Sequence, residues 1–107
     1  MTVNKIDSIL KQTGFPVAKI CFAKATTLPF IAYTPFTENI FADGKVVAKK
    51  HSIRIELHTK ELNSQAEETI EKVLKDNNIE WPDKDYSYIS SEKHFMLIYN
   101  IETEEKL

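Results

Sequence analysis

The sequence has a single cysteine, only two glycines and no excess of either charge. One cysteine, Cys21, excludes an internal disulfide, so the fold does not depend on an oxidising compartment. Two isolated glycines, Gly14 and Gly44, exclude a glycine-rich phosphate-binding loop. The 14 basic residues face 16 acidic ones, for a net charge of -2, whereas proteins held by nucleic-acid phosphates carry a basic excess. We therefore expect no specific nucleic-acid binding.

Long apolar runs are also missing. No stretch approaches the ~20 residues that span a bilayer, and residues 1–10 lack the basic start and apolar run of a signal peptide. We therefore expect no membrane contact, and a protein of the cytosol or one assembled there. The length of 107 residues fits a single domain over 1–107, large enough to bury one hydrophobic core without disulfides or metals.

The first half of the chain predicts a helix followed by three strands. Apolar residues at spacings of three and four predict a helix over 3–13. Alternation of apolar and polar residues predicts strands over 17–24 and 30–34, and Pro35 is expected to end the second. The long β-rich run 45–59 alternates most regularly, with one face in the core and the other in water.

The second half predicts a helix and a closing pair of strands. Ser64 and Glu67 have the spacing of a capping box, which places a helix start at Ser64. Strands are expected over 86–90 and 94–102. The charged tail 103–107 is expected to fray.

The resulting order is α-β-β-β-α-β-β. Strands cluster between two helices without repeated βαβ alternation, which favours an α+β fold with a mainly antiparallel sheet and two helices packed on one face. The other face of the sheet would then need water or a partner.

The sequence offers few groups for catalysis or metal binding. None of His51, His58 and His94 lies at metal-ligand spacing from a cysteine or another histidine, so we interpret them as surface residues on the wet side of strands. Cys21, between apolar neighbours, is interpreted as a small packing residue. We expect no metal, no cofactor and no enzymatic activity.

Arg54, Glu56 and His58 leave one alternative open, since they alternate along one strand face. They could form a proton-transfer site. A salt-bridge row on a solvated face explains them more simply.

The segment 36–44 is the most unusual part of the sequence. It is predicted to be a loop ending in the turn signal Asp43-Gly44, yet it carries Phe36, Ile40 and Phe41. Burying each such side chain is worth roughly 1.5–3 kcal/mol, so the segment either folds back over the core or inserts into a partner. The basic residues that follow are Lys45, Lys49, Lys50 and Arg54. They either protect a solvated strand edge or contact an acidic surface of another molecule.

Three segments stand in a suggestive order along the chain. They are Thr-Thr-Leu-Pro-Phe-Ile-Ala-Tyr at 26–33, Asp43-Gly44, and Ser-Ile-Arg-Ile-Glu-Leu at 52–57. A short helix precedes them, and a Glu-rich helix and a hairpin follow. In this order of elements the chain resembles, over nearly its whole length, the small tail-completion or head–tail joining proteins of long-tailed phages and prophages. It is similar to the lambda-type tail terminator.

The resemblance implies a non-enzymatic virion protein. Such proteins form rings, commonly hexamers, which end the tail tube and dock it to head-connector proteins. They are made in the host cytoplasm and reside in the virion tail. The implied docking segment comprises Phe36, Glu38, Asn39, Ile40, Phe41 and Asp43. The implied subunit-interface or lumen strand comprises Lys45, Lys49, Lys50, Arg54 and Glu56.

Two observations qualify this picture. The segment 36–44 is short for the large disorder-to-order transition that the resemblance would otherwise imply for a docking loop. A small regulatory module that binds and inhibits a host protein would need the same exposed segment without self-association, and it is the alternative function.

Overall fold

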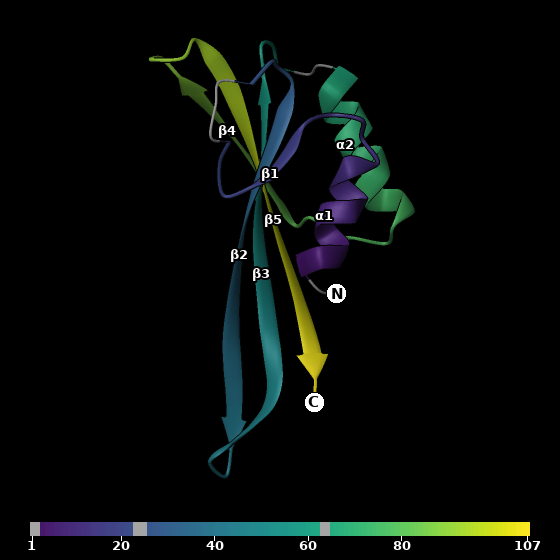
Figure 1. Cartoon of the computed structure of the whole chain (residues 1–107), viewed down its shortest axis with the longest axis vertical. Coiled ribbons are helices and arrows are strands. Elements are labelled where there is room, and N and C mark those ends of the chain that lie inside the picture. The colour runs from purple at the N-terminus through teal and green to yellow at the C-terminus, as the bar shows by residue number, and fades with distance from the viewer. Residues whose placement is uncertain (1–2, 23–25, 63–64) are drawn as a thin grey trace.

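The computed structural model describes residues 3–22, 26–62 and 65–107. These residues form two helices and five strands (Figure 1). In chain order the elements are α1 (Val3–Lys11), β1 (Val17–Lys19), β2 (Phe30–Ala42), β3 (Lys45–Thr59), α2 (Gln65–Asp76), β4 (Asp83–Ile89) and β5 (His94–Lys106). No helix among the described residues has the length and apolar character needed to cross a bilayer.

The strands form one sheet in the order β1-β2-β3-β5-β4. Only the β1–β2 pair is parallel, and the other three pairs are antiparallel. The predicted α+β class and the mainly antiparallel sheet are therefore confirmed. Because α2 connects β3 to β4 while β5 lies between them, the second strand of the closing hairpin is an interior strand and the first, β4, is an edge strand.

The hydrophobic core contains residues from both helices and from alternate positions of the strands. In β3 these positions are Ile53, Ile55 and Leu57, as the alternation predicts. The remaining core residues of the helices and strands are Ile6, Ile9, Leu10, Ile31, Tyr33, Ala66, Ile70, Leu74, Leu97, Tyr99 and Ile101. Fully burying such an aliphatic side chain stabilises the fold by roughly 1.5–3 kcal/mol.

Polar contacts also attach each helix to the sheet. Tyr33 Oη of β2 donates a hydrogen bond of 2.9 Å to Asp7 Oδ1 of α1. Lys84 Nζ of β4 reaches Glu67 Oε1 at 2.7 Å and Glu71 Oε2 at 3.1 Å on α2. These carboxylates raise the pKa of Lys84, the hydrogen bond to Glu67 being the largest cause, against the opposing effect of burial.

The largest correction concerns β2, which does not end at Pro35. The strand continues to Ala42, and Pro35 pairs with Ile53 of β3. Within the described chain, β1 pairs with β2 only as far as Tyr33, so Pro35 lies where β2 is an edge strand. A proline is tolerated there because its missing N–H leaves no bond to an inner neighbour unmade.

The predicted loop 36–44 is consequently a strand and a tight turn. Residues 36–42 pair with β3, with one register shift between Ile40 and Phe41. The turn signal itself is confirmed, because only Asp43 and Gly44 separate the strands. Their φ angles of 53° and 76° are both positive, as a two-residue type I′ hairpin turn requires.

Two smaller predictions also need correction, and a third lies outside the described residues. Of the strand expected over 17–24, the described residues 17–22 are strand only over Val17–Lys19, because Ile20 has a φ of 71° that ends the extended conformation; residues 23 and 24 lie outside the described residues. The tail expected to fray over 103–107 is instead strand through Lys106, which pairs with Ala48. Ser64, the expected helix cap, lies outside the described residues, and the helix is described from Gln65.

Candidate functional site: the projecting β2–β3 hairpin

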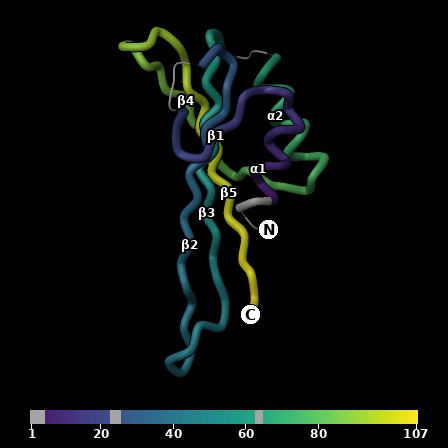
Figure 2. Tube along the Cα trace, viewed as in Figure 1, coloured from purple at the N-terminus to yellow at the C-terminus, as the bar shows by residue number. Residues whose placement is uncertain are grey.

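The sheet extends well beyond the helices at one end. Here β2 and β3 continue as a narrow ribbon, with the end of β5 beside part of it (Figures 1 and 2). The principal extents of 50 × 29 × 22 Å reflect this projection. We call residues 36–50 the distal hairpin. It contains all of the docking residues predicted from the sequence and three of the five predicted interface-strand residues.

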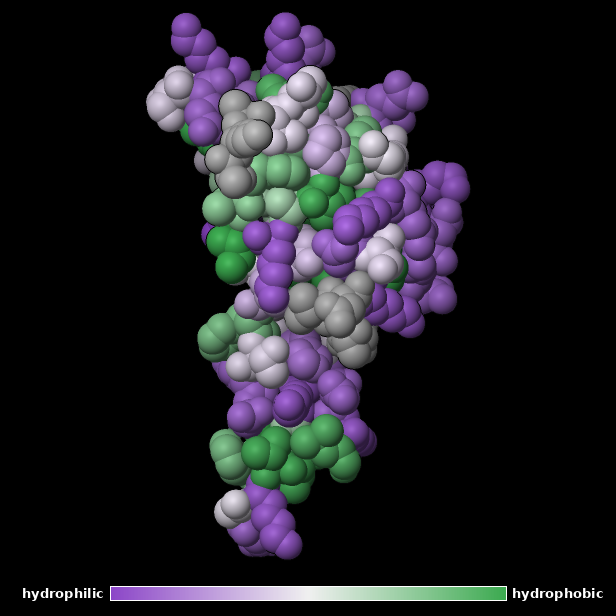
Figure 3. Space-filling view, in the orientation of Figure 1, coloured by the Kyte–Doolittle hydropathy of each residue, from purple (hydrophilic) through white to green (hydrophobic). Residues whose placement is uncertain are grey.

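Apolar side chains are exposed along the distal hairpin. Phe36 and Phe41 are 59% and 63% exposed, and Ile40 and Val47 are more than one-third exposed. Figure 3 shows an apolar patch near the tip of the projection, between more polar surfaces. Of the two alternatives for this segment, folding back over the core does not occur. These side chains are available to a partner.

The predicted charged residues divide between the two faces of the ribbon. Lys49 and Lys50 are neighbours on β3, so their side chains point to opposite faces. Lys50 Nζ lies 3.5 Å from Glu102 Oε1, and Lys49 pairs in register with Glu105. A single flat partner surface therefore does not contact both lysines. Glu38, Asn39 and Asp43 are exposed on the remaining part of the hairpin.

His51 anchors the base of the hairpin across three strands. Its Nδ1 lies 3.0 Å from Thr37 Oγ1 of β2, and its Nε2 lies 3.0 Å from Glu105 Oε2 of β5. The hydrogen bond with His51 lowers the pKa of the Glu105 carboxyl, against the opposing effect of desolvation. This chain of contacts holds the ribbon to β5.

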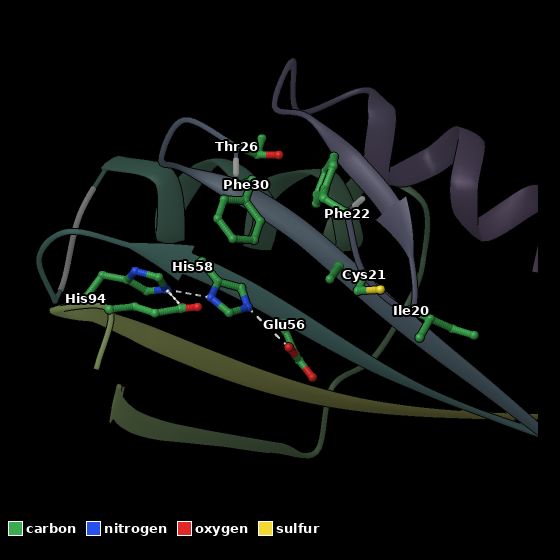
Figure 4. Close-up of a pocket in the computed structure, with 10 residues that line it drawn as sticks. Ile20, Cys21, Phe22, Thr26, Phe30, Glu56, His58 and His94 are labelled. Atoms are coloured by element: carbon green, nitrogen blue, oxygen red, sulfur yellow. Dashed lines mark hydrogen bonds and ion pairs between the residues drawn. The ribbon is translucent and has the colours of Figure 1, made fainter. Parts of the chain in front are cut away.

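The second polar grouping lies near the other end of the sheet. The predicted trio is brought together by Glu56, which forms an ion pair with Arg54 Nε at 3.2 Å and lies 3.1 Å from His58 Nε2. His58 Nδ1 in turn lies 2.8 Å from His94 Nε2, and Glu92 Oε2 lies 3.3 Å from that same nitrogen. Figure 4 shows Glu56, His58 and His94 together along the floor of a cleft of about 580 Å³, which Glu92 also lines.

The interpretation of the histidines as solvated surface residues is wrong. His51, His58 and His94 are 9%, 7% and 6% exposed. Residues after β1, including Cys21 and Phe22, line the cleft over this sheet face (Figure 4). Cys21 is exposed there, so its interpretation as a packing residue within a strand is also wrong.

Sequence reasoning found part of this grouping and missed the rest. Glu56 and His58 share a strand face at a spacing of two, which the alternation showed. His94 joins them only because β5 lies beside β3 with Met96 opposite His58. That register is a property of the folded sheet, and no spacing along the chain signals it.

Comparison with known proteins adds no family. No protein-family model matches the chain, and no similar curated protein was found.

Proposed function

We propose that the chain is a non-enzymatic virion-assembly subunit of a long-tailed phage or prophage. In this proposal it acts as a tail-completion or head–tail joining protein: copies associate into a ring, and the ring docks the tail tube to head-connector proteins. It would be assembled in the host cytoplasm and remain in the virion tail.

The observation that carries this proposal is the projecting distal hairpin with its exposed Phe36, Ile40, Phe41 and Val47. Each of these side chains would contribute up to roughly 1.5–3 kcal/mol if fully buried at an interface. A projection that inserts into a different surface of the next copy is a heterologous contact, and such contacts close into rings when the rotation allows it.

The arrangement of the helices supports the same proposal. We propose that α1 and α2 pack together on one face of the sheet, where their side chains share the core with β2, β3 and β5. The projecting ribbon extends past the helices (Figure 1). Both faces of its tip are then available to neighbouring copies.

The charges of the ribbon fit a passage for DNA without tight binding. Lysines 49 and 50 face acidic partners on β5 in the strand register, and the whole chain has a net charge of -2. Alternating charges of this kind give no continuous basic surface, so a strand facing the lumen would let DNA slide.

The test measures association and its dependence on the hairpin. Gel filtration with light scattering, on the protein alone and with a tail-tube protein, is expected to show a ring or a complex with tube ends. The double variant Phe36→Ser, Phe41→Ser should abolish that association while keeping the circular-dichroism spectrum. The control Leu62→Ser changes an exposed apolar residue outside the hairpin and should associate like the wild type.

A protein that stays monomeric and ignores tube ends would overturn the proposal. A strict monomer that binds one host protein tightly through the same hairpin would instead establish the regulatory-module alternative.

A further inference from the structure

The cluster at the floor of the cleft has the donor set of a metal site. His58, Glu92 and His94 each offer one ligand atom, and the three atoms lie within 4.8 Å of one another. We propose that these residues bind one divalent transition-metal ion, with Zn²⁺ as the best match, and that the ion fastens the β4–β5 turn to β3. Two imidazole nitrogens and one carboxylate are a ligand combination that zinc takes in proteins.

The spacing of the donors is close to that of a bound ion. Zinc–nitrogen and zinc–oxygen bonds of about 2.0–2.2 Å at tetrahedral angles place neighbouring ligand atoms about 3.3 Å apart. Glu92 Oε2 lies 3.3 Å from His94 Nε2, and His58 Nδ1 lies 2.8 Å from the same nitrogen. The histidine pair has to separate by about 0.5 Å, and the Glu92 oxygen lies within 4.8 Å of the His58 ligand atom.

Glu56 sets the protonation that His58 needs as a ligand. Its carboxylate Oε1, 3.1 Å from His58 Nε2, can only accept a hydrogen bond, so Nε2 carries the proton and a neutral ring leaves a lone pair on Nδ1. Arg54 Nε holds the other oxygen of Glu56 at 3.2 Å. A carboxylate behind a ligating histidine is the usual outer partner of a metal site.

His94 changes tautomer when the ion binds. Without an ion, the Nδ1 lone pair of His58 requires that His94 Nε2 donate the hydrogen bond of 2.8 Å. On binding, the Nε2 proton is replaced by the metal bond, and the neutral imidazole carries its proton on Nδ1. No net charge is added to either ring.

Among the described residues, the surroundings hold both rings in place and leave one side open to the cleft. Phe30 stacks on His58 with ring centroids 4.4 Å apart and presents its edge to His94 at 6.1 Å. Glu92 is in the turn between β4 and β5 and its side chain is 58% exposed, so it can adjust to an ion. The fourth position faces the cleft (Figure 4), where a water molecule would complete the tetrahedron.

The experiment uses tag-free protein that has been treated with chelator and dialysed. Calorimetric titration with ZnCl₂ should show one ion per chain, and the melting temperature should rise with zinc concentration. Titration with Co²⁺ should give the visible absorption of a tetrahedral ion. Glu92→Gln, at an exposed position, and His94→Gln should each weaken zinc binding at least tenfold.

Two controls separate this site from adventitious binding. His51→Gln alters another buried histidine beside a carboxylate, outside the cluster, and Cys21→Ser removes the thiol that lines the cleft. Both should bind zinc like the wild type. The proposal is overturned if the wild type binds no zinc at one ion per chain, or if either Glu92→Gln or His94→Gln binds zinc as tightly as the wild type.

Discussion

Lys84 Nζ lies 2.7 Å from Glu67 Oε1, and this ion pair joins the edge strand β4 to helix α2. The Glu67 side chain is only 7% exposed, so removing the cation leaves a buried carboxylate without this partner. Lys84→Met keeps the aliphatic stem and removes the charge. We expect it to lower the free energy of unfolding by about 2–3 kcal/mol in urea titrations.

The control for this prediction is Lys72→Met. Lys72 pairs with Asp76 along the exposed face of the same helix, at 2.8 Å, and exposed pairs of this kind contribute little. Its unfolding curve should match that of the wild type. Equal effects of the two substitutions would show that the β4–α2 contact has no special role.

We expect deprotonation of Tyr33 to lower the stability of the protein at alkaline pH. Burial and the hydrogen bond to Asp7 raise the pKa of Tyr33 from 10.0 to about 12. The folded state holds this proton more tightly than the unfolded chain. The contribution of the protonated hydroxyl to the free energy of unfolding is therefore complete below pH 10 and is lost between about pH 10 and pH 12. It amounts to at most about 3 kcal/mol.

The measurement is urea unfolding at about pH 9 and about pH 11.5. Tyr33→Phe should be less stable than the wild type at the lower pH and should lose less stability between the two. Tyr88→Phe, which changes an exposed phenol on β4, should retain the wild-type pH dependence. An unchanged pH dependence in Tyr33→Phe would contradict the prediction.

The hairpin turn requires Gly44 because of its backbone conformation, and not because a side chain would lack room. Its φ is +76°, and a Cβ at this position would meet nothing within 4 Å. Gly44→Ala is expected to destabilise the turn by about 1–2 kcal/mol, because a side chain disfavours left-handed φ. Amide exchange should accelerate severalfold at Phe41 and Val46, whereas Asp43→Asn should leave it unchanged since asparagine tolerates this conformation.

The last residues of β5 predict a local effect of truncation. A chain ending at Glu102 loses the strand pairing to residues 48–51 and the contact of Glu105 with His51. We expect at least tenfold faster amide exchange in that part of β3, with little change at core positions such as Ile55. Removing only Leu107, which takes away one hydrogen bond to Val47, should preserve most of the protection.

The elements with a regular pattern of apolar residues, either alternating as in a strand or spaced by three and four as in a helix, were predictable from the sequence. The strand 45–59 was predicted with the bounds that β3 has, and the first helix was predicted over 3–13 and found over Val3–Lys11. In these segments one face is buried in the core, so the apolar pattern and the structure have the same cause.

The distal hairpin was missed because residues 36–42 of β2 are all exposed. Glu38 and Asn39 are poor strand residues, and the pattern of residues 36–42 carries no core signal. A stronger clue was available: a two-residue turn at Asp43-Gly44 before a strand of 15 residues favours a partner of similar length. The predicted partner of five residues could not pair with most of β3.

The histidine cluster could not be predicted, for a different reason. His58 and His94 are 36 residues apart, and their contact depends on strand order and register. The same holds for the burial of His51 between Thr37 and Glu105. Cross-strand contacts depend on which strands are neighbours and in which register. Neither can be read from the spacing of residues along one sequence.

Strand β3 is continuous from Lys45 beside the hairpin turn to Thr59, past the core residues Ile53, Ile55 and Leu57. It therefore acts as a mechanical lever, with β2 alongside it over nearly the whole length. A load applied at the tip would be transmitted to Ile55 and Leu57 in the core, because β3 continues as one strand between them, with one irregularity of pairing at Val47. A partner that binds the tip of the distal hairpin would thus also determine the orientation of the rest of the domain relative to that partner.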